Sequence, residues 1–252
     1  MLLSVEELER SFGGVRALDG AAVQVAKGEV HGLIGPNGAG KTTLLNVVSG
    51  LFRPTRGRIV LGGERIDGLP PHRIAALGIT RTYQNIRLFP GLTALENVMV
   101  GAHLVRPGDT LRRMLFLPSA RADEAKSREA ALQLLSRVGL RERAHHRVSG
   151  LSYGDQRRVE IARALASSPR LVLLDEPTAG MNAAEVQAVA TVIRQVASTG
   201  QSVVLVEHNV QLVMQVCDRI TVLNFGKVIT HGEPRHVSSH PEVIAAYLGS
   251  EA

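Results

Sequence analysis

The feature that most constrains this chain is a glycine-rich loop between an apolar segment and a helical pattern. The apolar segment ends at Ile34, and apolar residues recur after the loop at Leu44, Leu45 and Val48. The loop residues are Gly35, Pro36, Asn37, Gly38, Ala39, Gly40, Lys41, Thr42 and Thr43. They match the Gly-x-x-x-x-Gly-Lys-[Ser/Thr] pattern of phosphate-binding loops, in the strand–loop–helix context that this pattern requires.

The chemistry of such a loop is anion binding. Its glycines allow backbone conformations in which successive N–H groups point at one spot, and the following helix adds its positive N-terminal end. Lys41 would reach the β- and γ-phosphates, and the Thr42 hydroxyl would ligate Mg²⁺. An ordinary glycine-rich turn is the weaker alternative, so the loop predicts a bound nucleoside triphosphate. It does not say what the nucleotide drives.

Composition narrows the classes of protein to which this chain can belong. No run approaches the roughly 18 apolar residues of a membrane span, and no basic-then-apolar secretory signal opens the chain. Cys217 is the single cysteine, which excludes an internal disulfide and fits the cytosol. The net charge of +6 would suit nucleic acid, but aromatic residues make up only 3%, so stacking platforms are scarce. Short basic pairs such as Arg157-Arg158 are expected to be solvated helix faces or to lie near an anionic membrane surface.

The hydrophobic pattern predicts an open α/β sheet with a smaller antiparallel sheet beside it. Short strands are expected within residues 1–30 and over Gly57–Gly63, and buried parallel strands at Leu171–Leu174 and Val203–Val206. Further expected elements are a helix with a capping-box start at Thr93, helices over Ala122–Val138 and Ala183–Ser198, a hairpin over Ile220–Thr230 and one short tail helix, Pro241–Leu248. Ligands of such sheets lie beyond the carboxyl ends of the strands.

Two carboxylates, Asp175 and Glu176, directly follow the apolar run Leu171–Leu174. This is the form of a Walker B strand, in which Asp175 would hold Mg²⁺ through water. Glu176 would polarise the water that attacks the γ-phosphate. Two carboxylates that simply end a strand are the structural alternative, which the phosphate-binding loop upstream makes the weaker one.

The segment Leu151-Ser152-Tyr153-Gly154-Asp155-Gln156 resembles the signature motif of ATP-binding-cassette (ABC) ATPases, whose common form is Leu-Ser-Gly-Gly-Gln. By this resemblance, an ATP held by a second subunit would be contacted by Ser152, Tyr153, Gly154 and Asp155. Ser152 is also a candidate N-cap of the following helix, with Asp155 three residues on. The two roles are compatible, because phosphates bind at helix N-termini.

Other positions resemble further ABC motifs. Gln84 resembles the Q-loop glutamine that contacts Mg²⁺ and the attacking water, and His208 resembles the switch histidine that bonds the γ-phosphate. Phe12 resembles the aromatic residue that stacks on adenine, with a place in the small-lobe core as its alternative. The D-loop position ends at Asn182 where Asp is commoner, which leaves the usual cross-dimer contact open; Asn182 is expected to cap the next helix together with Glu185.

The resemblance implies an α/β fold, a P-loop NTPase (RecA-like) core with an N-terminal antiparallel β subdomain and an inserted α-helical subdomain. The whole chain, 1–252, would be a single ABC ATPase domain. The core with the β subdomain would comprise 1–84 and 166–232, the helical subdomain with the signature motif 85–165, and a short C-terminal tail 233–252.

Within the family, the chain is similar to the ATP-binding subunit of branched-chain amino-acid importers. This rests on Tyr-Gly-Asp-Gln-Arg-Arg, Glu-His-Asn and the final Ala-Tyr-Leu-Gly, and on an insert at 103–120 that has no assigned structure. The resemblance implies ATP and Mg²⁺ as cofactors, and hydrolysis by Glu176, His208 and Gln84 that powers import of hydrophobic amino acids.

Expected partners are a second, homologous ATPase subunit, a membrane permease and, indirectly, an extracytoplasmic binding protein, with no nucleic acid. The expected location is the cytoplasmic face of the inner membrane, as a peripheral subunit. Three alternatives stay open: a urea or amide importer, a lipopolysaccharide-extraction ATPase that shares the short tail, and a soluble ABC ATPase without a transport role.

Overall fold

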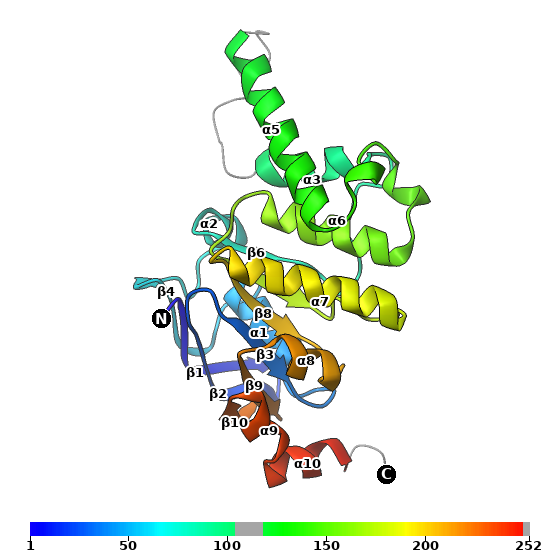
Figure 1. Ribbon diagram of the computed structural model, residues 1–252. Coiled ribbons are helices and arrows are strands. Elements are labelled where there is room, and N and C mark those ends of the chain that lie inside the picture. Colours follow the sequence, from blue (N-terminus) through cyan, green and yellow to red (C-terminus); the bar gives the residue numbers. More distant parts are fainter. Residues whose placement is uncertain (104–117, 249–252) are drawn as a thin grey trace.

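Two β-sheets form the centre of the molecule in the computed structural model, which describes residues 1–103 and 118–248 (Figure 1). The four-stranded antiparallel sheet has the order β2 (Val15–Val25), β1 (Leu3–Phe12), β4 (Arg56–Leu61) and β5 (Glu64–Arg65). The six-stranded sheet has the order β10 (Lys227–Gly232), β9 (Arg219–Asn224), β3 (Val30–Ile34), β8 (Ser202–Val206), β7 (Leu171–Asp175) and β6 (Ile79–Arg81). Its strands are parallel except for β10, which pairs with β9 as the predicted hairpin.

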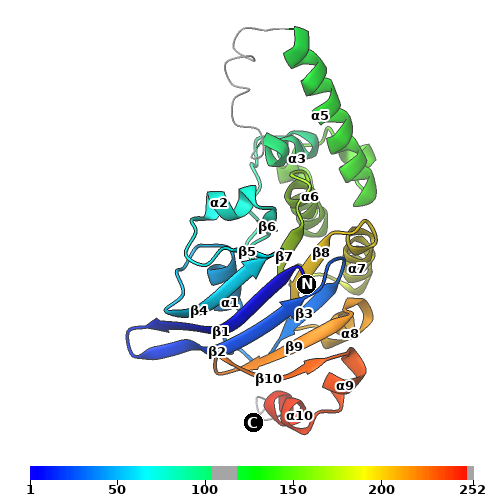
Figure 2. The same cartoon turned by 90° about the vertical axis from the view of Figure 1, so that its left-hand side faces the viewer.

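Helices cover this larger sheet and extend beyond it. They are α1 (Lys41–Val48), α2 (Pro71–Ala76), α3 (Ala94–His103), α5 (Pro118–Arg137), α6 (Tyr153–Leu165), α7 (Ala183–Ser198), α8 (Val210–Val216), α9 (Pro234–Ser238) and α10 (Pro241–Leu248). The helices α3, α5 and α6 stand together at one end of the molecule (Figures 1 and 2). The helix α1 shares one hydrophobic core with the four-stranded sheet and with one face of the larger sheet. No helix within 1–103 and 118–248 is long and apolar enough to cross a membrane.

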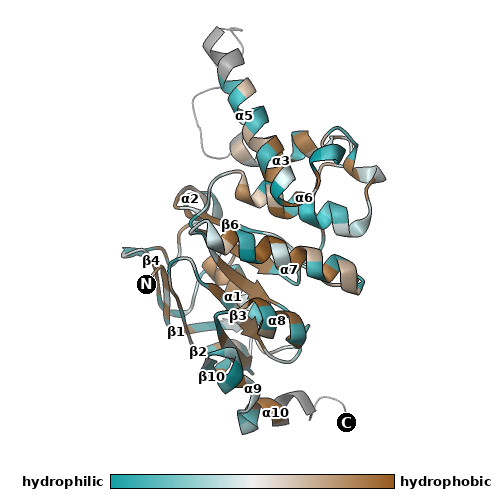
Figure 3. Ribbon diagram, viewed as in Figure 1, coloured by the Kyte–Doolittle hydropathy of each residue, from teal (hydrophilic) through white to brown (hydrophobic). Residues whose placement is uncertain are grey.

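The strand β7 illustrates why the central strands are continuously apolar. Its Leu171 and Leu173 join the hydrophobic core formed with α1 and the antiparallel sheet, while Val172 and Leu174 join the core under α7. Because successive side chains of a strand point to opposite faces, a strand covered on both faces must be apolar throughout. Figure 3 shows the central strands largely in the hydrophobic colour, whereas hydrophilic and hydrophobic residues alternate along α5. The predicted P-loop NTPase fold with its antiparallel sheet is confirmed.

The helical end of the molecule begins as predicted at Thr93. The Thr93 hydroxyl accepts a hydrogen bond from the Glu96 N–H (3.2 Å), and a Glu96 carboxylate oxygen accepts one from the Thr93 N–H (2.8 Å). This reciprocal pair is a capping box, which satisfies two N–H groups at the start of α3. Behind it, Leu95 and Val98 pack into the core that α5 and α6 share with the sheet.

Three expectations about the elements need correction. The N-terminal strands are long rather than short, 10 residues in β1 and 11 in β2. The tail holds two helices, α9 and α10, each of which begins with a proline; proline at the first helical position is well tolerated, so each one starts a new helix. The helix α5 begins at Pro118 rather than Ala122. Most of the insert expected at 103–120 lies outside the described residues.

Candidate active site

The glycine-rich loop turns sharply between β3 and α1, and two of its glycines are required by the backbone. Gly35 has φ +149°, and a Cβ there would lie 2.0 Å from the Leu223 carbonyl oxygen. Gly40 has φ +103°, and a Cβ there would lie 2.5 Å from the Ala17 carbonyl oxygen. Both positions therefore exclude any side chain, and Gly40 serves as the N-cap of α1.

The Lys41 side chain lies back across this loop. Its ammonium group donates to the carbonyl oxygens of Gly35 (2.7 Å) and Pro36 (2.9 Å), and the residue is 6% exposed. Burial lowers the pKa of Lys41, while the nearby carboxylates of Glu176 and Asp175 act in the opposite direction. The predicted phosphate-binding cation is thus held inside the loop, beside the two predicted carboxylates.

Gln84 and His208, which are far from Glu176 in the sequence, both contact its carboxylate. One carboxylate oxygen accepts a hydrogen bond from the Gln84 side-chain amide (2.9 Å), and the other lies 3.1 Å from His208 Nε2. The three residues follow β6, β7 and β8, which are neighbours in the sheet. The carboxyl ends of parallel strands therefore bring together the three residues predicted to be catalytic.

Glu176 has a strained backbone. Its φ is +47°, in the left-handed region that residues with a Cβ rarely adopt. Such a conformation costs about 1–3 kcal/mol and persists only where the surroundings impose it. Here the Glu176 N–H donates to the Val206 carbonyl oxygen (2.9 Å), which holds the turn after β7 against β8.

Asp175 ends β7 and is buried. One of its oxygens accepts a hydrogen bond from Arg81 (2.8 Å), a residue that the sequence pattern did not single out. The Asp175 N–H donates to the Thr82 hydroxyl (3.4 Å), which further fixes the strand end.

A second overlooked carboxylate, Glu207, joins the segments that follow β7 and β8. One of its oxygens accepts from the N–H (2.8 Å) and hydroxyl (2.6 Å) of Thr178, and the other accepts from the His208 N–H (3.1 Å). Its place directly before His208, at the end of an apolar strand, is the only sequence signal for it. It holds the backbone of His208 close to that of the Walker B turn.

The signature motif opens α6 as predicted. The Ser152 hydroxyl accepts a hydrogen bond from the Asp155 N–H (3.2 Å), so Ser152 is the N-cap. Ser152 and Tyr153 are exposed. Asp155 is 4% exposed, and its two oxygens bind Arg143 and Arg158, so its side chain is engaged within the helical end. Its contact with a second subunit's nucleotide stays a prediction.

The helix α6 also binds the Gln84 segment directly, through Arg157. The guanidinium donates to the carbonyl oxygens of Tyr83 and Gln84 (2.6 Å each), and pairs with Glu160 (2.6 Å). Arg157 is 0% exposed, so the expectation that the Arg157-Arg158 pair lies on a solvated helix face is wrong for this residue. The reason is that carbonyl oxygens and a carboxylate from two elements converge on it, which compensates for the loss of water.

Phe12 and Asn182 are the remaining residues that the sequence motifs singled out. Phe12 ends β1 and is 39% exposed; its ring packs edge-on against Phe52 (5.1 Å between centroids), under the guanidinium of Arg10. Its stacking on adenine stays a prediction. The capping box of Asn182 and Glu185 at the start of α7 is confirmed.

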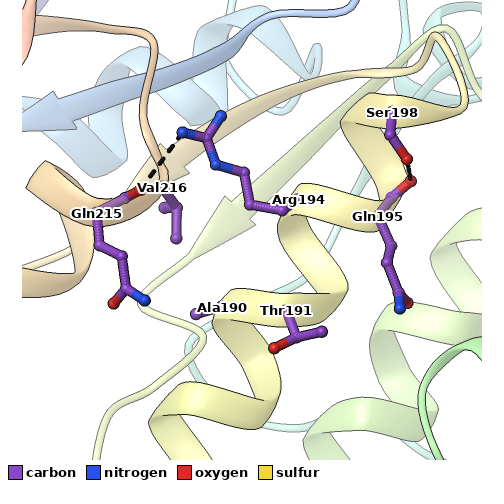
Figure 4. A pocket seen from close by; sticks show the side chains of 7 residues that line it. All are labelled: Ala190, Thr191, Arg194, Gln195, Ser198, Gln215 and Val216. Carbon is purple, nitrogen blue, oxygen red and sulfur yellow. Dashed lines mark hydrogen bonds between the residues drawn. The ribbon is translucent and has the colours of Figure 1, made fainter.

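A hollow elsewhere on the surface does not involve these residues. It lies between α7 and α8 (Figure 4), and Arg194 bridges it by donating to the Gln215 carbonyl oxygen (3.4 Å). Its lining residues are Ala190, Thr191, Arg194, Gln195, Ser198, Gln215 and Val216. Five of them lie on α7 from Ala190 onward, and Gln215 and Val216 end α8. Both sets lie away from the helix starts that follow Glu176 and His208, so this hollow is separate from the catalytic cluster.

The fold and the site together define a nucleotide-binding domain of the ATP-binding-cassette class. The family model described as "ABC transporter" matches residues 18–179, and the model described as "Branched-chain amino acid ATP-binding cassette transporter" matches residues 227–252. The chain belongs to the ABC transporter family of ATPases.

Relatives of known function match over the full length. The high-affinity branched-chain amino acid transport ATP-binding protein BraF of Pseudomonas aeruginosa is 42% identical, and LivG of Escherichia coli (strain K12), described in the same words, is 40% identical. Each match covers 98% of this chain and 98% of the relative. The lipopolysaccharide export system ATP-binding protein LptB of Acidithiobacillus ferridurans is 38% identical, over 99% of this chain and 98% of the relative.

Solved structures of ATP-binding cassettes also match the fold of this chain. The ADP conformation of MJ1267, an ATP-binding cassette of an ABC transporter, matches with a TM-score of 0.86 at 30% identity, over 98% of both chains. The ATP-binding cassette MJ0796, solved as a dimer in a post-hydrolysis state with ADP and Pi, matches with a TM-score of 0.77 at 27% identity, over 93% of this chain and 99% of that one.

Proposed function

We propose that this chain is the ATP-hydrolysing subunit of an importer for branched-chain amino acids. The names of BraF and LivG support this substrate class, and the match of residues 227–252 to a branched-chain transporter model supports it independently. The observation that carries the catalytic part is the Glu176 carboxylate, held between Gln84 and His208 at the strand ends beside Lys41.

In this proposal Lys41 and the loop amides bind the phosphates of ATP. Lys41 already lies in the loop, and it exchanges the carbonyl oxygens of Gly35 and Pro36 for phosphate oxygens as the nucleotide enters. Glu176 is the general base that takes a proton from the attacking water. Gln84 and His208 orient its carboxylate, and His208 also contacts the γ-phosphate. Phe12 stacks on the adenine.

The oxygen donors in this site suit Mg²⁺. Thr42, Gln84 and Asp175 offer hydroxyl, amide and carboxylate oxygens, which this ion prefers. Mg²⁺ takes one or two carboxylates and completes its shell with water and phosphate. Asp175 binds Arg81 through one oxygen, and in the described chain no hydrogen bond reaches the other. Bound Mg²⁺ would neutralise charge on the phosphate oxygens.

A second, homologous ATPase subunit completes each site. The exposed Ser152 and Tyr153, with the backbone of Gly154, contact the ATP held in the loop of that subunit, and Asp155 fixes this helix start through its N–H bond to Ser152. The dimer of the related cassette MJ0796 supports such pairing. The pair works on a membrane permease at the cytoplasmic face of the inner membrane, where this chain is peripheral, and indirectly with an extracytoplasmic binding protein. Nucleic acid has no role.

Each part of the chain has its own role in this proposal. Residues 1–84 and 166–232 bind and hydrolyse the nucleotide, 85–165 carry the signature motif, and 233–252 form the tail. The grip of Arg157 on the carbonyl oxygens of Tyr83 and Gln84 supports a mechanical link between the first two parts.

Isolation of the membrane partner tests the proposal. An affinity-tagged copy expressed in the source organism is extracted with detergent, and the co-purifying multi-span protein is identified by mass spectrometry. A branched-chain amino-acid permease is expected. In parallel, a deletion strain should lose uptake of labelled leucine, which the wild-type chain restores and Glu176→Gln does not.

LptB, at 38% identity, makes a lipopolysaccharide-export system the main alternative. Recovery of a lipopolysaccharide-export permease, together with unchanged leucine uptake in the deletion strain, would decide for that alternative. A urea or amide permease would point to the third possibility.

A further inference from the structure

A buried guanidinium lies where three elements of the nucleotide site meet. Arg81 is the last residue of β6, three positions before Gln84. Its Nη2 donates to Asp175 at the end of β7 (2.8 Å), and its Nη1 donates to the Asn46 side-chain oxygen (2.6 Å) and the Ser49 hydroxyl (3.1 Å). The side chains of Arg81 and Asp175 are 5% and 4% exposed.

The acceptors on α1 fix the orientation of this guanidinium. Asn46 lies on α1, and Ser49, three residues later, is the C-cap of this helix, so the two share one face. The Ser49 hydroxyl donates its own hydrogen to the Leu45 carbonyl oxygen (2.7 Å), which leaves its lone pairs for Arg81. A planar fork that reaches three acceptors on two elements cannot rotate without losing one of them.

Asp175 depends on Arg81 for its charge balance. A buried carboxylate is stable only when it is paired or hydrogen-bonded. Lys41, the other nearby cation, points instead at the carbonyl oxygens of Gly35 and Pro36. Among the described residues, Arg81 is the one that forms an ion pair with Asp175.

We propose that Arg81 is a positioning residue for Asp175. It clamps one carboxylate oxygen to the helix of the phosphate-binding loop, so that the other oxygen faces the metal–nucleotide site. This rests on the proposed role of Asp175 toward Mg²⁺. Arg81 thereby supports the metal site, although it lies in none of the sequence motifs.

The test measures metal affinity rather than turnover. Mn²⁺ serves as the probe, and its binding to the ADP-loaded full-length protein is followed by electron paramagnetic resonance. Loss of a residue that orients a metal ligand typically weakens metal binding roughly 10- to 100-fold. We expect a loss of this size in Arg81→Met, and also in Arg81→Lys, because a single ammonium nitrogen cannot occupy the two positions from which Nη1 and Nη2 donate. ADP affinity in EDTA should stay as in the wild type.

Two further variants keep the outcome decisive. Asn46→Ala retains the ion pair but removes its anchor on α1, and should weaken Mn²⁺ binding by a smaller factor; it decides the matter if the Arg81 variants do not fold. Arg194→Lys alters an exposed arginine–aspartate pair with Asp218 (2.8 Å) away from the site and serves as the control.

Asp175→Asn separates the two claims. If it leaves Mn²⁺ binding intact, Asp175 is not a metal ligand and the proposed function is wrong at that point. If it abolishes Mn²⁺ binding while the Arg81 and Asn46 variants bind Mn²⁺ like the wild type, the positioning role is overturned. An equal loss of ADP affinity in EDTA for the Arg81 variants would also overturn it, since Arg81 would then support the loop and not the carboxylate.

Discussion

Replacement of Arg157 by methionine tests whether its buried network holds α6 to the Gln84 segment. The substitution keeps the unbranched stem of the side chain but removes the donors to Tyr83, Gln84 and Glu160. Glu160 is 1% exposed, so it would be left as a buried carboxylate without its closest partner. Breaking a buried pair in this way costs about 3–5 kcal/mol. The Arg87 N–H (3.1 Å) and Arg163 (3.8 Å) still reach Glu160, which favours the lower end of that range.

Urea unfolding followed by circular dichroism measures the loss. The double variant Arg157→Met/Glu160→Leu should recover part of it, because a buried pair replaced by apolar residues is often neutral. The Tyr83 and Gln84 carbonyl oxygens and the Arg87 N–H remain without these partners, at about 1 kcal/mol each. Arg194→Met, which removes an exposed pair, should cost less than about 1 kcal/mol. The reasoning is refuted if Arg157→Met costs no more than Arg194→Met.

Three further predictions concern the loop, the D-loop cap and the lone thiol. Lys41→Ala should weaken ATP binding roughly 10- to 100-fold, the value of one or two charged hydrogen bonds; titration calorimetry that finds unchanged affinity would contradict the loop assignment. Asn182→Ala should cost about 1 kcal/mol of unfolding free energy, and Asn182→Gly only a few tenths, because glycine is a tolerated N-cap; equal losses would count against the capping box. Burial raises the pKa of Cys217 to about 12. Since the unfolded thiol ionises first as pH rises above about 9, stability should fall by up to about 1.4 kcal/mol per pH unit there. Cys217→Ala should lack this increment, and an identical pH dependence in both proteins would refute it.

Part of the convergence at Glu176 was predictable from strand patterns. Glu176 and His208 each follow an apolar strand pattern, and parallel strands bring their carboxyl ends to one edge. Gln84 was assigned to the site by the family resemblance alone, because the short strand before it, Ile79–Arg81, has no apolar pattern. The glycine loop was equally predictable from the sequence, because Gly35 and Gly40 have conformations and neighbours that no other residue tolerates. These features depend on local sequence and on strand direction alone.

The supporting residues were not predictable in the same way. Arg81, Arg157 and Glu207 are charged side chains whose burial depends on partners from other elements. A sequence pattern treats such residues as solvated, because an isolated charge would be too costly to bury. Asp155 shows the same limit, because its place in the signature motif did not predict that its carboxylate is buried against Arg143 and Arg158.

The most direct test of the account is the ATP hydrolysis rate of Glu176→Gln in the assembled transporter. The amide keeps the shape of the side chain but cannot accept a proton from water. General bases contribute roughly 10²- to 10⁴-fold to such reactions, so turnover should fall by at least about 100-fold while ATP still binds. Hydrolysis at the wild-type rate with ATP bound would contradict the central claim that Glu176, held by Gln84 and His208, drives this site.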